Sequence, residues 1–345
     1  MSNKEEFTFD KLADIPIFVG IGNRSNLEAI VVTQSGKVFL YDLGDGDETE
    51  IGQVTFDANQ LQLQIHNFCD FVGVTQKNGT FGTVLSLTDC KYAKALERGE
   101  YCAYASQFPI AFYAKDEKTF LIHGTEWNRL DITCLESDDL LTDRIIDDEN
   151  DLNSFDYFHS SLSVSPDSTS FISNGWHWHP FGRVTHYSID RFLSDYEAAH
   201  FDILLTDDAD PEDAYLEADW DRPHCWIARD KIAFGCNRGS GYYGEKIFQS
   251  EILIYDLKSK AITRIPFDGF RVTDEGDVAG SLYFDSERNR LIGLNSKTGL
   301  LITELDGIVI LKNESLAGFD YNVRHSVFFR WDEDGRKLEL IRINN

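Results

Sequence analysis

A short stretch with the sequence WHWHP, residues 176–180, alternates tryptophan and histidine. In an extended backbone alternate residues point to opposite sides, so His177 and His179 would share one side and the two indoles the other. Two imidazoles on one side could bind a transition metal if His224 or a carboxylate supplied a third ligand. An H-x-H pair is a weak motif by itself, however, and Pro180 indicates a turn that interrupts the alternation.

The same stretch has two other interpretations. Trp176 and Trp178 could contact a partner protein directly, because aromatic side chains supply much of the binding energy at interfaces. Alternatively, the indoles pack over a neighbouring element while the histidines form hydrogen bonds with the backbone. We therefore expect an aromatic and partly structural loop, with a metal at His177 and His179 as an alternative.

The segment from residue 207 to residue 221 is strongly acidic. Its eight carboxylates are Asp207, Asp208, Asp210, Glu212, Asp213, Glu217, Asp219 and Asp221. A calcium loop would need the pattern D-x-[DN]-x-[DN]-G, whose glycine is missing here. The segment is therefore either a solvated link or an acidic docking surface, in which Trp220, Tyr242 and Tyr243 provide aromatic anchors.

A further group lies in the stretch WNRLD, residues 127–131. Arg129 and Asp131 are two residues apart, so they could form an ion pair that ties a turn, or Arg129 could reach a ligand. Trp127 adds an aromatic side chain to the same turn. The complete predicted partner-binding set is Trp127, Arg129, Trp176, Trp178, Asp219, Trp220, Asp221, Tyr242 and Tyr243.

Motifs of the standard catalytic sites are absent from the sequence. It contains no G-x-S-x-G elbow, no P-loop and no G-x-G-x-x-G at the start of a helix. The glycine-rich run NRGSGYYGEK, residues 237–246, lies between two expected strands and lacks the helix that a phosphate-binding loop requires. We therefore expect no cofactor. The enzymatic alternative is a metal-dependent hydrolase or lyase whose ligands come from distant segments.

These residues are carried by a repeat of four short strands. One copy contains PIAFYA, TFLIHGT, RLDITCL and LLTDR, separated by polar turns. Later copies contain LSVS, SFISNG and RVTHYSI, then CWIA, KIAFGC, EILIYDL and AITRIPF, then SLYFD, RLIGLNS and LLITELDG. Earlier copies contain IPIFVGI, EAIVVTQ and VFLYDL, then FVGVTQ, FGTVLSL and KYAKAL.

The last copy contains AGFDYN, HSVFFRW and KLELIRI and then lacks a fourth strand. The N-terminal run EFTFDKL, residues 6–12, can supply it, which gives seven units closed by pairing the two chain ends. Repeated four-stranded sheets form a β-propeller, whose closure protects the strand edges. We therefore predict an all-β fold, a single β-propeller domain over residues 1–345, with six or eight blades as alternatives.

Several of these runs resemble known repeats. VSPDSTSF, IYDLKSKAI and LIHGTEWNRLDI are similar to blades of WD40-like repeat proteins, although Tyr41–Asp42 and Tyr255–Asp256 replace the usual Trp-Asp pair. HGTEWNRLDI followed by SPDSTSFISNGWHWHPFG resembles a set of bacterial propellers. The resemblance implies a propeller fold and, because no activity is established for the bacterial set, little about function.

The longest connections are expected on one face. In a propeller, the loops between second and third strands and the links between blades emerge on the same face. The WHWHP stretch, the acidic segment and the glycine-rich run occupy such positions in the neighbouring fourth and fifth repeats. Because long loops in compact domains are often functional, we predict that this face of the third to fifth repeats binds a partner.

The net charge indicates the kind of partner. The chain has 32 basic and 59 acidic residues, which gives a formal charge of −27. Such a field repels nucleic acids and anionic membranes and attracts a basic protein. The sequence shows no signal peptide and no membrane-spanning run, and its six cysteines are scattered without a C-x-x-C pair, which is typical of the cytoplasm.

Together these observations predict a cytoplasmic, non-catalytic protein-interaction propeller with a basic partner. The more specific hypothesis is an immunity protein that neutralises a bacterial toxin. A structural scaffold with several weak partners is a further alternative, and self-association is left open.

Overall fold

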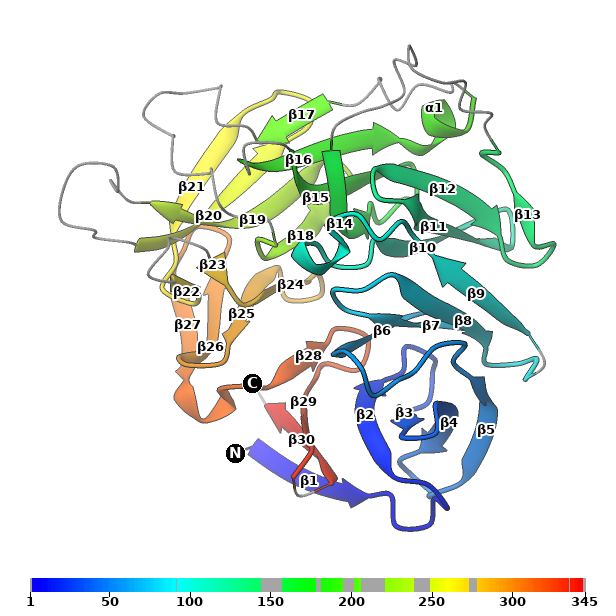
Figure 1. Cartoon of the computed structure of the whole chain (residues 1–345). Coiled ribbons are helices and arrows are strands. Elements are labelled where there is room, and N and C mark those ends of the chain that lie inside the picture. The colour runs from blue at the N-terminus through cyan, green and yellow to red at the C-terminus, as the bar shows by residue number, and fades with distance from the viewer. Residues whose placement is uncertain are drawn as a thin grey trace. The chain divides into compact units, whose positions relative to one another are not determined.

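The computed structural model describes residues 2–90, 92–143, 157–177, 181–194, 202–205, 221–238, 249–272, 278–334 and 336–343. The described residues form seven four-stranded antiparallel sheets, and the chain is an all-β propeller with seven blades (Figure 1). Within each sheet the strands follow one another in sequence order, except where the chain ends meet. Among the described residues, no helix is both long and apolar enough to cross a membrane.

The strands of the first three blades are as follows. Blade 1 contains β2 (Pro16–Ile21), β3 (Glu28–Thr33), β4 (Lys37–Asp42) and β5 (Glu48–Gln53). Blade 2 contains β6 (Leu63–Phe68), β7 (Phe71–Gln76), β8 (Phe81–Ser86) and β9 (Ala93–Glu97). Blade 3 contains β10 (Ile110–Lys115), β11 (Lys118–Glu126), β12 (Arg129–Cys134) and β13 (Asp139–Leu140), and a 3-10 helix (Ala103–Ala105) precedes it.

The remaining blades have the same plan. Blade 4 contains β14 (Tyr157–Val164), β15 (Ser170–His177), β16 (Phe181–Ser188) and β17 (Asp202–Leu205), with α1 (Ile189–Ser194) before β17. Blade 5 contains β18 (His224–Ala228), β19 (Lys231–Arg238), β20 (Gln249–Asp256) and β21 (Ile262–Pro266), and a small hairpin of β22 (Arg271–Val272) and β23 (Val278–Ala279) follows. Blade 6 contains β24 (Ser281–Asp285), β25 (Arg290–Asn295), β26 (Gly299–Glu304) and β27 (Val309–Asn313). Blade 7 contains β28 (Asp320–Asn322), β29 (Val327–Asp332), β30 (Lys337–Ile343) and β1 (Ser2–Thr8).

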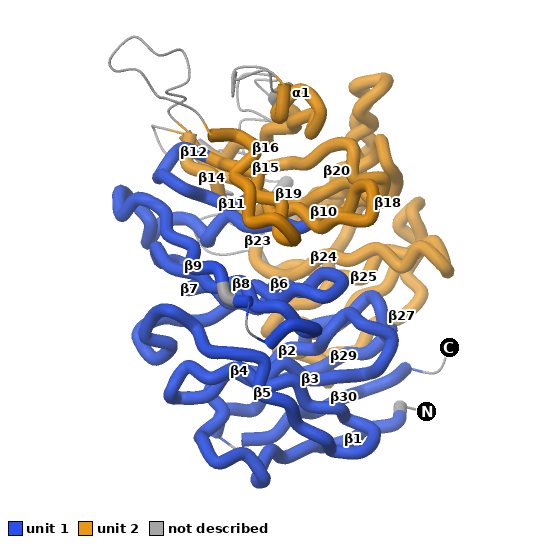
Figure 2. Tube along the Cα trace, turned by 90° about the vertical axis from the view of Figure 1, so that its right-hand side faces the viewer, with its two compact units in different colours: residues 1–112, 123–129, 320–345 blue, residues 113–122, 130–319 orange. Residues whose placement is uncertain are grey.

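Contacts divide the chain into two compact units (Figure 2). Unit 1 comprises residues 1–112, 123–129 and 320–345, and so contains blades 7, 1 and 2. Unit 2 comprises residues 113–122 and 130–319 and contains blades 4, 5 and 6, while the strands of blade 3 are shared between the units. A single domain over the whole chain stays a prediction.

Each blade buries aliphatic and aromatic side chains against its neighbour. In unit 2, Ile172 and Val184 of blade 4 pack in one cluster with Phe234 and Leu253 of blade 5. In unit 1, a second cluster joins Val31 of blade 1 to residues of blade 7. The strand-forming runs of the sequence therefore supply the layers between blades, as branched and aromatic residues do in sheets.

Short polar side chains shape several turns between strands. Asp256 Oδ1 accepts hydrogen bonds from the backbone N–H groups of Lys258 and Ser259 at 3.0 and 2.9 Å, at the end of β20. Asp42 Oδ1 accepts from the N–H of Gly44 at 2.7 Å at the end of β4. The aspartates of the two Tyr-Asp pairs thus stabilise the turn that leads to the outer strand.

The two chain ends pair in blade 7, as the sequence predicts. β1 lies antiparallel to β30, in a register from Ser2 opposite Ile343 to Thr8 opposite Lys337. β1 is the outer strand of this blade, because the order is β1-β30-β29-β28. It begins a few residues earlier than the predicted run 6–12.

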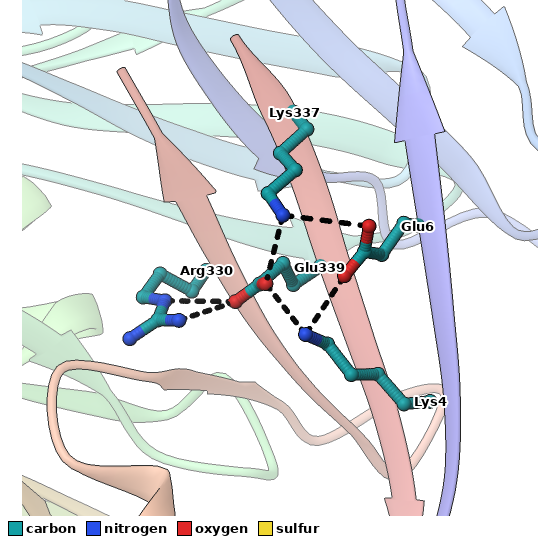
Figure 3. A network of polar contacts seen from close by, with 5 residues as sticks. All are labelled: Lys4, Glu6, Arg330, Lys337 and Glu339. Carbon is teal, nitrogen blue, oxygen red and sulfur yellow. Dashed lines mark hydrogen bonds and ion pairs between the residues drawn. The ribbon is translucent and has the colours of Figure 1, made fainter. Parts of the chain in front are cut away.

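A polar network joins these paired ends (Figure 3). Glu339 of β30 is 3% exposed and accepts hydrogen bonds from Lys4 Nζ at 2.7 Å and Arg330 Nη2 at 2.5 Å. Lys337 Nζ lies 3.6 Å from Glu339 and 3.4 Å from Glu6. Burial raises the pKa of Glu339, but the hydrogen bonds from Lys4 and Arg330 outweigh it and lower the pKa to about 2. This buried carboxylate is therefore charged at neutral pH and holds both ends of the chain.

One strand was not predicted, and one is shorter than predicted. β6 precedes the FVGVTQ run, which is therefore the second strand of blade 2. The outer strand of blade 3 is limited to Asp139–Leu140, although LLTDR suggests a longer run.

Candidate protein-binding surface

The link from β9 to β10 in unit 1 is anchored by Arg98, whose side chain is 3% exposed. Its Nε donates to the carbonyl oxygen of Gly79 at 2.9 Å. Its Nη2 donates to the carbonyl oxygens of Ala103 at 2.9 Å and Ser106 at 2.8 Å. Its Nη1 donates to Ser106 Oγ and to the carbonyl oxygen of Gln107, both at 3.0 Å. One buried guanidinium thus fixes the backbone of the link before any partner binds, which lowers the entropy cost of binding.

This link presents three aromatic side chains, which we call the aromatic patch: Tyr101, Tyr104 and Trp127. Tyr104 is 78% exposed and Tyr101 is 50% exposed, and Trp127 is half-buried in the turn between β11 and β12. The rings of Tyr101 and Trp127 meet edge to face, with 5.4 Å between their centroids. A Cβ atom on Gly99 would lie 3.1 Å from the backbone nitrogen of Trp127, so the link and this turn approach closely. The patch is therefore both exposed and held in place.

Carboxylates are present on the same link and turn. Glu97, Glu100 and Glu126 are exposed. Aromatic faces attract cations, and carboxylates form charge-assisted hydrogen bonds with lysine and arginine. Arg129, at the start of β12, is half-buried beside this surface. The exposed aromatic rings and these three carboxylates together suit a partner that presents basic side chains.

In unit 2, three connections of blades 4 and 5 begin from the same face of the sheets. The β15–β16 hairpin ends there at the pair His177 and Phe181, and the β19–β20 hairpin ends there at Arg238 and Gln249. β17 ends and β18 begins on this face too, because consecutive strands of each blade run antiparallel. The three connections are residues 178–180, 206–220 and 239–248, which lie outside the described residues.

Trp176, the first indole of the WHWHP stretch, is a packing residue of blade 4. It is 4% exposed and stacks on Phe158 of β14, with ring centroids 3.8 Å apart and planes within 7°. Its cross-strand neighbour in β16 is Gly182. The indole therefore supports the base of the loop, and a partner contact by Trp176 itself stays a prediction.

His177 alternates with Trp176 and is half-buried. The Nη2 atom of Arg183 lies 3.4 Å from His177 Nε2. A guanidinium carries only donors, so the imidazole nitrogen accepts and a metal at Nε2 would have to displace a cation. Within the described ranges, no three His, Cys, Asp or Glu residues gather as a metal site requires. The metal hypothesis depends on His179, which lies outside the described residues, and stays a prediction.

The acidic segment re-enters the fold at Asp221 and Arg222. Asp221 is exposed and accepts a hydrogen bond from Ser160 Oγ of β14 at 2.8 Å. Arg222 is 1% exposed, and its Nη1 lies 3.5 Å from Cys236 Sγ. The carbonyl oxygen of Arg222 accepts from Asn174 Nδ2 at 2.9 Å. A buried arginine thus fixes the end of this link, as Arg98 fixes the link before blade 3.

His224, proposed from sequence as a third metal ligand, follows directly in β18. Its Nδ1 lies 3.1 Å from the carbonyl oxygen of Arg222, which implies that Nδ1 carries the proton. Burial lowers the pKa of His224. The imidazole is therefore neutral at physiological pH and hydrogen-bonded to the backbone.

Only some of the residues predicted from sequence belong to the described part of the chain. The described ones are Trp127, Arg129, Trp176, His177 and Asp221. Their contact with a partner stays a prediction. The predicted residues outside the described ranges are Trp178, His179, Asp219, Trp220, Tyr242 and Tyr243. Sequence reasoning missed Arg98, Tyr101 and Tyr104, because a lone arginine and two scattered tyrosines in a polar link form no recognisable motif.

No family model matches the chain, and no curated protein matches it. Solved propellers are similar in structure. The WD40 domain of Pan2 from Neurospora crassa has a TM-score of 0.56 at 11% identity, over 99% of this chain and 94% of that chain. A chain in the crystal structure of the mitotic checkpoint complex has a TM-score of 0.56 at 10% identity, with the same coverage. The WD40 propeller domain of Doa1 has a TM-score of 0.52 at 10% identity, over 96% of this chain and 94% of that chain.

At these identities the likeness shows the fold alone. The chain has the β-propeller fold of WD40 domains. The narrower resemblance to bacterial propellers stays a prediction.

Proposed function

We propose that this propeller is a protein-interaction module that binds a basic partner. The binding surface would be formed by the links and second-to-third-strand loops of blades 3 to 5. The observation that carries the proposal is the aromatic patch: two exposed tyrosines and a half-buried tryptophan on a backbone that the buried Arg98 fixes. Exposed aromatics on a rigid backbone lose little entropy on binding, and they are typical anchors of interfaces.

The charge of the chain supports a basic partner in particular. The net charge is −27, and residues 207–221 contain eight carboxylates and no lysine or arginine. Opposite charge accelerates association and discriminates against acidic proteins. The aromatic patch would then contact basic side chains through cation–π interactions, each worth about 0.5–1 kcal/mol at exposed sites.

A narrower version of the proposal is an immunity protein that neutralises a basic bacterial toxin. It is supported by the acidity of the chain and of residues 207–221. The likeness to a chain of the mitotic checkpoint complex supports the general use of this fold in assemblies and not this particular partner.

The proposal can be tested with an oligo-arginine peptide as a probe. We expect the wild type to bind it and the double variant Tyr101→Ala/Tyr104→Ala to bind about tenfold more weakly, because two cation–π contacts are lost. The matched control is Val323→Ala, since Val323 is 46% exposed and belongs to the turn between β28 and β29, which is not part of the link. Binding should weaken from 50 to 500 mM salt.

Equal affinity of the tyrosine double variant and the control would contradict the role of the aromatic patch. Binding that is insensitive to salt would contradict the electrostatic part of the proposal. The scaffold alternative predicts that single substitutions leave most binding intact. The hydrolase or lyase alternative predicts stoichiometric metal in the purified protein.

A further inference from the structure

The carboxylate of Glu126 lies beside the aromatic patch. Glu126 is the last residue of β11 and directly precedes Trp127. A Cβ atom on Gly99 would lie 2.9 Å from Glu126 Oε2 and 3.1 Å from the backbone nitrogen of Trp127. Gly99 is two residues before Tyr101, so this carboxylate lies against the backbone that carries an exposed aromatic ring. The patch therefore brings a ring and an anionic group close together.

A second carboxylate, that of Glu100, is next to Tyr101 in the chain. Glu100 and Glu126 are both exposed, and no lysine or arginine of the described ranges lies within ion-pair distance of either. The neighbouring Arg98 is 3% exposed and donates hydrogen bonds to carbonyl oxygens of the link. The two negative charges are therefore available to a cation from another molecule.

The ring of Tyr101 can receive a flat cation. Tyr101 is 50% exposed, and its edge-to-face contact with Trp127, at an interplanar angle of 77°, restricts its motion. A guanidinium that stacks on an aromatic face keeps its five N–H groups in its own plane, parallel to the ring. These donors point past the rim of the ring, where a neighbouring carboxylate such as that of Glu126 can accept them.

A lysine side chain cannot use the ring and the carboxylate equally well. Its ammonium group is compact and strongly hydrated, and an aromatic face cannot replace the hydrogen bonds to water that it would lose. A guanidinium is more weakly hydrated, and it can pair bidentately with a carboxylate while it stacks. An exposed ring beside a carboxylate therefore discriminates between two cations of equal charge.

We infer that the aromatic patch is selective for arginine over lysine, with Tyr101 as the stacking face and Glu126 as the specificity-determining acceptor. This inference rests on the proposed function and narrows it, because the basic partner then presents an arginine to the patch. The net charge of −27 attracts both kinds of cation and cannot supply this discrimination. The selectivity depends on the side chains of the patch alone.

The test compares the binding of hexa-arginine, hexalysine and hexacitrulline to the full-length chain by isothermal titration calorimetry. The first two peptides carry the same charge, and citrulline keeps the planar end group of arginine without its charge. We expect hexa-arginine to bind about tenfold more tightly than hexalysine, since it adds stacking and bidentate pairing to the same attraction. Hexacitrulline should bind at least about tenfold more weakly than hexalysine, because it lacks that attraction.

Three variants locate the selectivity. Glu126→Gln keeps the size of the side chain, removes its charge and should reduce the ratio of the two affinities from about tenfold to about threefold or less. The matched control is Glu50→Gln, which removes the same charge from an exposed position in blade 1 and should leave the ratio unchanged. Tyr101→Leu keeps an apolar side chain without a ring and should also reduce the ratio. All three positions are exposed, so far-UV circular dichroism should show an unchanged fold.

The outcomes separate this inference from the proposed function. Equal affinity for hexa-arginine and hexalysine, both weakened in Tyr101→Ala/Tyr104→Ala, would overturn the selectivity and leave the proposed function standing. A selectivity that persists in Glu126→Gln would overturn the role of Glu126. If neither cationic peptide binds, or if both bind the tyrosine double variant as tightly as the wild type, the proposed function fails together with the inference.

Discussion

Replacing Glu339 by glutamine should weaken the closure of the propeller in a pH-dependent manner. Glu339 is 3% exposed and lies among Lys4, Arg330 and Lys337, which join β1, β29 and β30 (Figure 3). The change keeps the size of the side chain and removes its charge. The three cations then lose the carboxylate that they share.

The magnitude follows from the pKa of Glu339, which the network lowers from 4.5 to about 2. Each tenfold change in an acid constant is about 1.4 kcal/mol, so the full difference is about 3–4 kcal/mol at neutral pH. Lys4 is 47% exposed and Arg330 is 42% exposed, and solvent screens their interaction with Glu339. We therefore expect Glu339→Gln to lower the free energy of unfolding by about 2 kcal/mol at pH 7.

The pH dependence has a definite sign. A carboxylate whose pKa is lowered in the folded state stabilises the protein above the unfolded pKa, near 4.5. This stabilisation is lost as the pH falls through about 2. The difference between wild type and Glu339→Gln should therefore fall to less than half at pH 3 and nearly vanish at pH 2.

Urea unfolding at pH 7, 4 and 3 measures this difference. Hydrogen exchange of the β1 amides at pH 7 gives a local readout, in which about 2 kcal/mol corresponds to roughly 30-fold faster opening. The control is Glu50→Gln, because Glu50 and Lys37 form an exposed pair, 46% and 43% exposed, and should contribute less than about 1 kcal/mol. A loss below 0.5 kcal/mol for Glu339→Gln, or a loss that is equal at pH 7 and pH 3, would refute the role of the network.

Three further changes test other parts of the account. Trp176→Ala should lower the free energy of unfolding by about 3–5 kcal/mol in urea unfolding, since it leaves a cavity against Phe158, and a loss below 1 kcal/mol would contradict the packing role. Gly175→Ala should lower the melting temperature by several degrees in calorimetry, because its Cβ would clash with the carbonyl oxygen of Phe158, and an unchanged melting temperature would rule out this clash. Arg98→Lys should leave the fold intact but accelerate hydrogen exchange in residues 99–107 and weaken oligo-arginine binding, because a single ammonium group cannot replace the five bonds of the guanidinium. Unchanged exchange in this link would contradict its anchoring by Arg98.

The repeat and its closure could be predicted because each depends on local patterns. Strand-forming runs separated by polar turns indicate four-stranded units, and the missing strand at the C-terminus matches the surplus strand at the N-terminus. Strand β6 was missed although Leu63 and Ile65 alternate with Gln64 and His66. Gln64 and Asn67 are half-buried, and their amides form hydrogen bonds with Gln107 and with the backbone of Ile21. These partners belong to distant segments of the chain, so the burial of the polar residues could not be read from the sequence of the strand itself.

The candidate surface could be predicted only in part for a related reason. The turn at Trp127 and the acidic segment stand out in the sequence by composition. The burial of Arg98 depends on the carbonyl oxygen of Gly79, which belongs to the turn between β7 and β8. Trp176 stands beside the exposed loop in sequence, yet its cross-strand register places it on Phe158. Tertiary contacts between distant segments decide which of these side chains are exposed.

Binding of a basic protein through the aromatic patch, which we propose for this propeller, can be measured directly. The most direct measurement is affinity capture from a lysate of the source cells at 50 and 500 mM salt, with the tagged wild type, Tyr101→Ala/Tyr104→Ala and Val323→Ala in parallel. We expect one dominant basic protein that the wild type and Val323→Ala retain at low salt, and that is lost at high salt and in the tyrosine double variant. Retention of an acidic protein, or equal retention by all three proteins at both salt concentrations, would contradict it.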